Sequence, residues 1–221
     1  VEAVSITDEG HIVPSTSVGN TPTFVSRAKK VIVELNTTQP LSLEGIHDIY
    51  IPKDPPHRRP VPITGVRDRV GLPWIECPHE KVVAIVMSDI GDTQRPLAAI
   101  DETSRRMAGN LLDFLDMEVK AGRLPSNLLP LQSGVGNVAN AVLSGLKEWP
   151  TDGLLVYTEV IQDAVFDLMD SGKLAFASGT ALTPSPECAA RVYADMNRYR
   201  DRMILRPQEI SNHPEVIRRL G

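Results

Sequence analysis

From about residue 100 onward, short apolar runs that favour β-strands alternate with segments whose apolar side chains recur at helical spacing. The strand-like runs are residues 128–132, 154–158 and 174–177, and the helical stripes fall within 101–119, 138–149, 161–168 and 186–203. Strands that alternate with helices of roughly 10–15 residues form βαβ units and a parallel sheet. The pattern therefore predicts an open, mostly parallel α/β sheet with flanking helices, whose ligands bind beyond the carboxyl ends of the strands.

Residues typical of helix boundaries support these helical segments. Asp101 can cap the first helix through its carboxylate, and Gly172 can end the third in the left-handed conformation. Ser185 and Pro186 form an N-cap and first-turn pair for the fourth helix. A further helix is expected at 213–220.

The first eighty residues have a different character. Residues 1–39 read as short strands, of which the β-branched run 31–35 is expected to be buried. Seven prolines lie between residues 51 and 80, and they disfavour both helix and central strand. This segment is therefore predicted to wrap over the surface or to lead to a boundary, before another strand at 82–87.

Composition excludes several classes of function. The net charge is −5 and aromatic residues make up 5% of the chain, so neither a basic surface nor a stacking platform for nucleic acid is expected. No stretch approaches the ~18 apolar residues of a membrane-spanning helix. Cys77 and Cys188 are too few for a disulfide framework and predict free thiols in a reducing, cytoplasmic setting. Because the chain begins inside strand-like sequence and ends on a helix, we expect a piece of a longer protein.

Two neighbouring strand ends carry residues suited to chemistry. At 132–137 the sequence Gln-Ser-Gly-Val-Gly-Asn lets the backbone turn sharply, and the N–H groups of the next helix favour an anion or developing oxyanion. A tight turn without function explains this Gly-x-Gly about equally well. Glu159 follows the strand at 154–158 and is expected to start a helix, a position that carboxylates favour in any case. Together, the two features favour an active site.

Other candidates have simpler explanations. Cys77 and His79 offer metal ligands, but no second pair at ligand spacing exists, so no metal site is expected. Ser133 lies outside a Gly-x-Ser-x-Gly elbow, which argues against a serine hydrolase. Asp163 lies one helical turn after Glu159 and is better explained as a first-turn charge than as a paired acid.

Three longer stretches are more specific: LLPLQSGVGNVANAV at 128–142, VYTEVIQD at 156–163 and LRPQEISNHP at 205–214. They resemble the acetyl-CoA hydrolase/transferase family of class I CoA-transferases, and the likeness is nearest to the bacterial succinyl-CoA:acetate CoA-transferases. The resemblance covers nearly the whole chain in family order. It implies the NagB/RpiA-like CoA-transferase fold, with two similar open α/β domains and the active site in the cleft between them.

The resemblance also implies a carboxylate nucleophile. Glu159 matches the catalytic glutamate, which forms an acyl-glutamyl anhydride and then a glutamyl-CoA thioester. The Val135 backbone N–H matches an oxyanion donor, and Asn212 matches an asparagine near the glutamate, although it could equally cap the following helix. Arg95, otherwise a solvated loop charge, falls near the carboxylate-binding arginine of the family. The family's CoA-binding loop corresponds to Gly134, Val135, Gly136, Asn137 and Val138.

For the whole protein, the resemblance sets broader expectations. Family members are much longer, so residues 1–85 are predicted to end the first domain and residues 86–221 to begin an incomplete second domain, which could be inactive alone. The expected activity moves CoA between an acyl-CoA and a short-chain carboxylate, with acetyl and succinyl groups favoured, no cofactor beyond CoA as substrate, and a homodimer at full length. Two alternatives stay open, namely net hydrolysis of acetyl-CoA and a non-catalytic CoA-binding α/β module.

Overall fold

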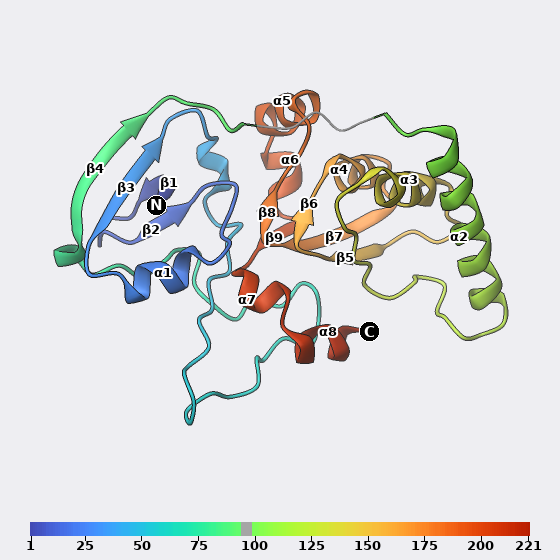
Figure 1. Cartoon of the computed structure of the whole chain (residues 1–221), viewed down its shortest axis with the longest axis horizontal. Coiled ribbons are helices and arrows are strands. Elements are labelled where there is room, and N and C mark those ends of the chain that lie inside the picture. Colours follow the sequence, from blue (N-terminus) through green and yellow to red (C-terminus); the bar gives the residue numbers. More distant parts are fainter. Residues whose placement is uncertain (94–98) are drawn as a thin grey trace.

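The structure contains two sheets that lie next to each other, each accompanied by helices (Figure 1). It is a computed structural model that describes residues 1–93 and 99–221. The first 88 residues form a four-stranded sheet, and residues 154–205 form a three-stranded sheet beside a two-stranded ribbon. Most neighbouring strands are parallel, which confirms the open α/β architecture expected from the sequence.

The first sheet contains β1 (Glu2–Ile6), β2 (Ile12–Pro14), β3 (Val31–Asn36) and β4 (Val82–Ser88), in the order β2-β1-β3-β4. Strands β1, β3 and β4 are parallel, whereas β2 runs antiparallel to β1. The expectation of strands throughout residues 1–39 is wrong for α1 (Thr21–Arg27). Pro22 lies in the first turn of this helix, where its fixed φ suits the helix and no N–H is required.

Strands β3 and β4 differ in burial although they pair along their whole length. In β3, Val31 and Val33 are buried but Ile32 is exposed, so the strand expected to be buried has only one face in the core. The strand predicted at 82–87 is confirmed as β4, which lies at the sheet edge. Its central residues are exposed on both faces, as Ile85 and Val86 show.

The proline-rich segment contains no helix or strand between residues 51 and 78, as predicted. Short 3-10 turns precede and follow it, at Leu41–Leu43 and His79–Lys81. The segment passes under both sheets toward the C-terminal helix (Figure 1). Val61 and Ile63 are buried there in a small apolar cluster with Ile210 and Val216, and Arg219 donates hydrogen bonds to both their carbonyls.

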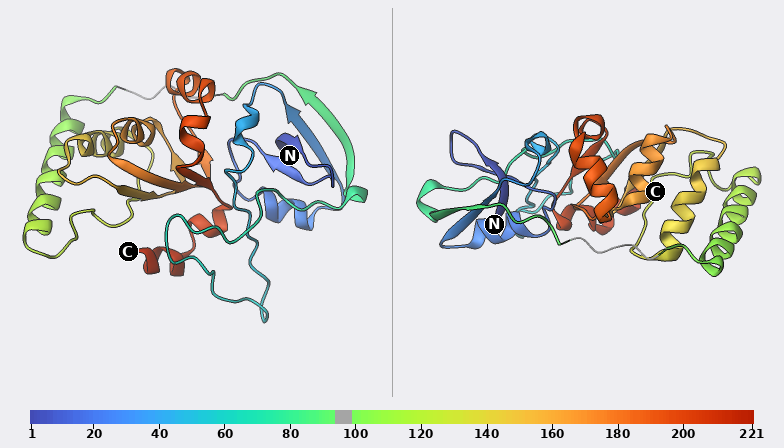
Figure 2. Two further views of the ribbon diagram at one scale, coloured as in Figure 1. Left: turned by 180° about the vertical axis from the view of Figure 1, so that it is seen from behind. Right: turned by 90° about the horizontal axis from the view of Figure 1, so that it is seen from above.

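The second half alternates helices and strands. Strands β5 (Leu154–Tyr157), β7 (Leu174–Gly179) and β9 (Met203–Leu205) form the parallel sheet, and β6 (Val160–Ile161) pairs with β8 (Ala181–Leu182). The helices are α2 (Glu102–Lys120), α3 (Asn137–Gly145), α4 (Asp163–Asp170), α5 (Pro186–Ala194), α6 (Asn197–Arg200), α7 (Gln208–Ser211) and α8 (Pro214–Leu220), with a 3-10 turn at Leu146–Glu148. Helix α4 packs on β7, and α3 and α2 follow outward from it (Figure 2).

The helix-boundary predictions are confirmed. The Asp101 carboxylate accepts a 2.7 Å hydrogen bond from the Ser104 N–H at the start of α2. Gly172 follows the end of α4 with a φ of 79°. Ser185 accepts from the Cys188 N–H at the start of α5.

The expected strand at 128–132 is wrong. Leu128 and Leu129 have φ values of 60° and 58°, which a strand cannot contain, and only Leu131 pairs with a strand, through a bridge to Val156. The apolar side chain of Leu128 packs in the hydrophobic core without belonging to a strand.

The helix expected over 186–203 also differs from the structure. It breaks after Ala194, α6 follows, and Met203 begins β9 by pairing with Ala177 of β7. Met203 and the residue after it are fully buried in the sheet, so long-range pairing overrides a local helical pattern.

One hydrophobic core joins the two sheets. Buried Ile12 and Val33 of the first sheet belong to the same cluster as Leu154 and Leu205 of the second. The domain boundary predicted between residues 85 and 86 falls inside β4, and the division into domains stays a prediction. Among the described residues, no helix is long and apolar enough to cross a membrane.

Candidate active site

Glu159 lies beyond the carboxyl end of β5, as the parallel sheet predicts. Its backbone is fixed from the neighbouring strands, because the Thr180 N–H donates to the Glu159 carbonyl at 2.7 Å and the Thr158 N–H donates to the Ser178 carbonyl. The expected helix start at Glu159 is wrong, since β6 intervenes and α4 begins at Asp163. Pairing of β6 with β8 accounts for this difference.

Two side-chain amides hold the half-buried Glu159 carboxylate. The Gln208 Nε2 donates to Oε1 at 3.0 Å, and the Asn212 Nδ2 donates to Oε2 at 3.4 Å. Gln208 begins α7 and Asn212 follows its end, so the two residues lie one turn apart on the side that faces β5. The predicted proximity of Asn212 to Glu159 is present, and Asn212 does not cap α8, whose N-cap residue is His213.

Gln208 is the site residue that sequence reasoning missed. The signal was available, because Gln208 and Asn212 are spaced by four residues and follow the apolar strand run that becomes β9. What the sequence cannot show is that β9 and β5 flank the same strand, β7. That topology brings α7 next to Glu159.

The glycine loop lies beside the end of β5. The Leu131 N–H donates to the Leu155 carbonyl, and the Thr158 hydroxyl donates to the Ser133 carbonyl at 3.0 Å. Gly136 precedes α3 with φ 141° and ψ 169°, a conformation that is nearly restricted to glycine. No side chain caps the N-terminus of α3, and a Cβ at Gly136 would meet no atom within 4 Å.

Residues of this loop line three cavities. One of about 470 Å³ is lined by Glu159, Asn212 and Gln132. A second, of about 610 Å³, is lined by every residue from Gln132 to Val138. Val135 is 73% exposed and also lines a third cavity, of about 470 Å³, together with Val160. The glutamate and the loop therefore open onto adjoining spaces that meet at Gln132.

A buried ion pair lies next to the elements that carry the site. Arg206, between β9 and α7, is fully buried and pairs with Asp48, while its Nε donates to the Ser178 hydroxyl at 2.9 Å. Asp48 also accepts from the Val70 and Gly71 N–H groups. Burial lowers the pKa of Arg206, and the Asp48 charge opposes that shift. The pair thus fastens the proline-rich segment to the strand that leads into α7.

Tyr157, the last residue of β5, also links the sheet to α7. Its hydroxyl donates to the Ile210 carbonyl at 2.7 Å, which ties β5 to α7 directly. Burial raises the pKa of Tyr157 to about 12, so the phenol stays neutral and keeps its proton for this bond.

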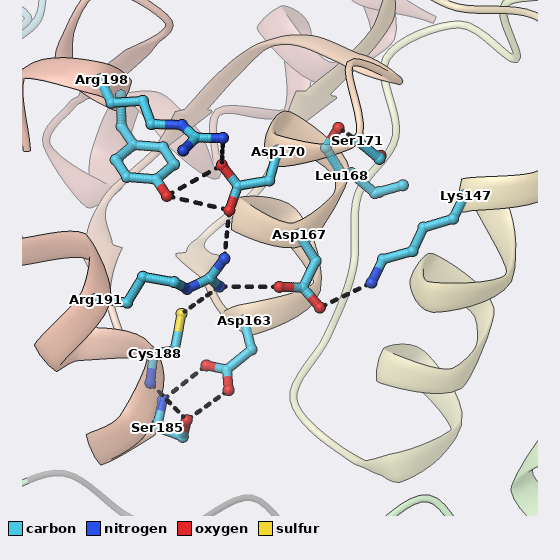
Figure 3. Close-up of polar contacts among 11 residues, drawn as sticks. Lys147, Asp163, Asp167, Leu168, Asp170, Ser171, Ser185, Cys188, Arg191 and Arg198 are labelled. Atoms are coloured by element: carbon cyan, nitrogen blue, oxygen red, sulfur yellow. Dashed lines mark hydrogen bonds and ion pairs between the residues drawn. The ribbon is translucent and has the colours of Figure 1, made fainter. Parts of the chain in front are cut away.

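The remaining sequence candidates lie away from Glu159. Asp163 accepts from the Ser185 N–H at 2.7 Å and from its hydroxyl at 2.6 Å, so it joins α4 to α5 and is no partner for Glu159 (Figure 3). Figure 3 also shows Arg191 between Asp167 and Asp170, which extends the same connection between the two helices. Arg95 falls outside the described residues.

Neither cysteine offers reactive chemistry. Cys77 and Cys188 are both buried free thiols, and burial raises the pKa of Cys188 to about 11. In the part of the chain that the structure describes, no three His, Cys, Asp or Glu side chains gather closely enough to hold a metal ion.

The fold is that of CoA-transferases. Solved structures with the same fold include RipA from Yersinia pestis, at a TM-score of 0.66 and 18% identity, which covers 100% of this chain and 43% of that one. Another is a 4-hydroxybutyrate CoA-transferase from Porphyromonas gingivalis, at a TM-score of 0.63 and 17% identity, covering 98% of this chain and 46% of that one. The fold expected from the sequence is therefore confirmed.

Sequence comparisons match one family. Residues 1–87 match the acetyl-CoA hydrolase/transferase N-terminal domain. The whole chain is 52% identical to 41% of a succinyl-CoA:acetate CoA-transferase from Clostridium kluyveri, and 49% identical to 42% of an acetyl-CoA hydrolase from Schizosaccharomyces pombe. The resemblance to the acetyl-CoA hydrolase/transferase family is therefore borne out, over residues 1–87 by the family model and over the whole chain by the curated relatives. The chain spans less than half the length of these curated relatives.

Proposed function

We propose that the protein containing this chain moves CoA between an acyl-CoA and a short-chain carboxylate, with Glu159 as the nucleophile. The observation that carries the proposal is the Glu159 carboxylate itself, held by two amides beyond a parallel strand and next to an uncapped glycine loop. Relatives named as a succinyl-CoA:acetate CoA-transferase and as acetyl-CoA hydrolases support the acyl-CoA substrate. CoA acts as a substrate, and the reaction requires no cofactor.

In the proposed first half-reaction, a Glu159 oxygen attacks the thioester carbonyl carbon and the C–S bond breaks. CoA leaves as the thiolate with the bonding electron pair, and an acyl-glutamyl anhydride remains. The thiolate then attacks the glutamyl carbonyl carbon, the bond to the acyl-bearing oxygen breaks, and the acyl group departs as a carboxylate. The glutamyl-CoA thioester that results accepts a second carboxylate by the same steps in reverse.

The glycine loop has a proposed role in both steps. Each attack places negative charge on a carbonyl oxygen, and preorganised N–H donors lower the free energy of that charge. The exposed backbone at Val135, before the uncapped N-terminus of α3, is suited to such a donor. The open space around Gly134 and Gly136 would admit CoA close to the backbone. Asn212 adds a side-chain donor at Oε2 of the Glu159 carboxylate.

Hydrolysis is the second candidate, because several relatives of similar identity are acetyl-CoA hydrolases. Water would then intercept the anhydride or the glutamyl thioester in place of an acceptor carboxylate. Product analysis separates the two activities. A transferase converts acetyl-CoA and an acceptor carboxylate to acetate and a new acyl-CoA without net release of free CoA, whereas a hydrolase releases free CoA and needs no acceptor.

Other features of the full-length protein are also proposals. Arg95 would bind the carboxylate of the acceptor, with acetyl and succinyl groups as the favoured substrates. A homodimer and a cytoplasmic location complete the expectation. Sedimentation of the full-length protein and a fluorescent fusion in the native host test these two points.

Borohydride trapping tests the nucleophile. The protein, at the length of its relatives, is incubated with acyl-CoA and then reduced, which should convert a Glu159–CoA thioester to an alcohol detectable by peptide mass. Glu159→Ala should abolish both the adduct and turnover. Near-normal transfer by a folded Glu159→Ala variant would show that the assigned nucleophile is wrong.

A further inference from the structure

Helix α7 is fixed from three directions, which makes the side chain of its first residue a precise donor. The Gln208 N–H donates to the Gly19 carbonyl at 2.9 Å, and Glu209 accepts from the Thr23 hydroxyl of α1. The Thr180 hydroxyl donates to the Arg206 carbonyl at 2.6 Å, immediately before the helix. Because the backbone is already anchored, only the rotamers of the Gln208 side chain are restricted when it reaches Glu159.

The two amides at Glu159 differ in burial and in the length of their hydrogen bonds. Gln208 is half-buried and approaches Oε1 at 3.0 Å, whereas Asn212 is exposed and approaches Oε2 at 3.4 Å. A bond of 3.0 Å is near the ordinary N–H···O distance, whereas 3.4 Å lies beyond it. The oxygen facing Gln208 is therefore the held oxygen, and the oxygen facing Asn212 is the freer one, beside the cavity that Asn212 lines.

We propose that Gln208 is a positioning residue for the Glu159 nucleophile. This inference rests on the proposed function and extends it. By holding one carboxylate oxygen, Gln208 aims the other toward the cavity where the thioester would lie. The acyl group then bonds to the oxygen on the Asn212 side. The oxygen held by Gln208 remains as the oxygen of the glutamyl carbonyl, whose carbon the CoA thiolate attacks next.

This role makes specific demands on the Gln208 side chain. It must donate a hydrogen bond and must not carry negative charge, because a second carboxylate about 3 Å away would repel Glu159. Gln208→Ala removes the donor. Gln208→Glu preserves the shape but donates only while its carboxyl is protonated.

The first test measures steady-state CoA transfer in the full-length protein. Gln208→Ala should lower kcat about 10–100-fold, the range for a lost hydrogen bond to a charged group, with a change in KM below about threefold. Gln208→Glu should retain activity at acid pH and lose it as the pH rises, because ionisation of Glu at this position turns attraction into repulsion. Tyr157 does not interfere, since its pKa of about 12 keeps it neutral over this range.

Glu215→Gln provides the matched control. It makes the reverse exchange of amide and carboxyl at an exposed position in the first turn of the neighbouring helix, α8. Its kcat and pH profile should match those of the unmodified protein. Circular dichroism on all variants excludes a folding defect as the cause of lost activity.

The outcomes separate the two proposals. If Glu159→Ala abolishes transfer but both Gln208 variants keep normal kcat and pH profiles, the positioning role is wrong and the nucleophile stands. If Glu159→Ala retains transfer, the proposed function itself is wrong. A Gln208→Glu profile that falls equally at every pH would also overturn the positioning role, because it would indicate a structural defect.

Discussion

The two sheets contain similar apolar, parallel strands but differ in how completely they are covered. In β4, at the edge of the first sheet, Val83 and Ile85 are 50% and 55% exposed, whereas Leu154 of β5 and Ala177 of β7 are fully buried. The second sheet has helices packed beside it and the proline-rich segment of the first half along its lower edge (Figure 1). Strand ends that position a reactive carboxylate need such enclosure, because small displacements at a nucleophile cost large factors in rate.

The largest difference between the two regions is expected in how much free energy of unfolding is lost when an ion pair is broken. Arg206→Met leaves Asp48 buried and unpaired and should lower the free energy of unfolding by about 3–5 kcal/mol. Arg27→Met breaks an exposed pair with Asp54 beside the first sheet and should cost at most about 1 kcal/mol. Urea unfolding of both variants checks the difference. Equal costs would mean that the buried pair does not hold the two regions together.

Truncation of apolar strand residues sharpens the same comparison. Leu154→Ala in β5 should destabilise the protein by about 2–5 kcal/mol, because it leaves a cavity in the shared core. Val83→Ala in β4 removes a half-exposed side chain and should change stability by only about 0.5 kcal/mol. Calorimetry measures both. A large loss for Val83→Ala would indicate that β4 is covered in the assembled protein.

Acid should weaken the junction between the regions through His47. His47 is buried, and its Nε2 lies 2.9 Å from the Ser15 carbonyl. The backbone of His47 also forms an isolated β-bridge with Leu205 of β9. Burial lowers its pKa from 6.5 to about 4. Between these values the unfolded chain binds more protons than the folded chain, so stability should fall as the pH drops from 6.5 to 4, by about 3 kcal/mol in total.

The control for this prediction is His47→Gln, which keeps a donor for the Ser15 carbonyl but does not titrate. Its free energy of unfolding should depend less on pH between 4 and 6.5 than that of the unmodified chain. Parallel pH dependences for the two proteins, measured by urea titration, would contradict a buried neutral His47.

The glycine loop should show a moderate effect on stability but a severe effect on activity. Gly136→Val forces a branched residue into a conformation that costs about 1–3 kcal/mol, and it fills space beside the loop, so transfer should fall severely. Val135→Ala leaves the backbone unchanged and should be mild. Comparable kinetics for the two folded variants would argue against a backbone cradle at this loop.

Local signals in the sequence predicted most of the second half. Capping residues such as Asp101 and Ser185 act over three or four positions, so the helices that they begin could be located without the fold. Glu159 could also be placed, because a strand followed by a turn puts its last side chains at one sheet edge. The helix at Thr21–Arg27 was missed because its apolar residues are too few to show a helical periodicity.

The sequence by itself therefore determined the α/β class, the family resemblance and the carboxylate at the end of β5. Only the tertiary structure decided which side chains meet that carboxylate. Gln208 reaches Glu159 because β9 and β5 both pair with β7, and Arg206 becomes a buried support because Asp48 arrives from 158 residues away. Short-range patterns encode backbone conformation, whereas contacts between distant segments depend on strand order and on which surfaces the whole chain can bury together.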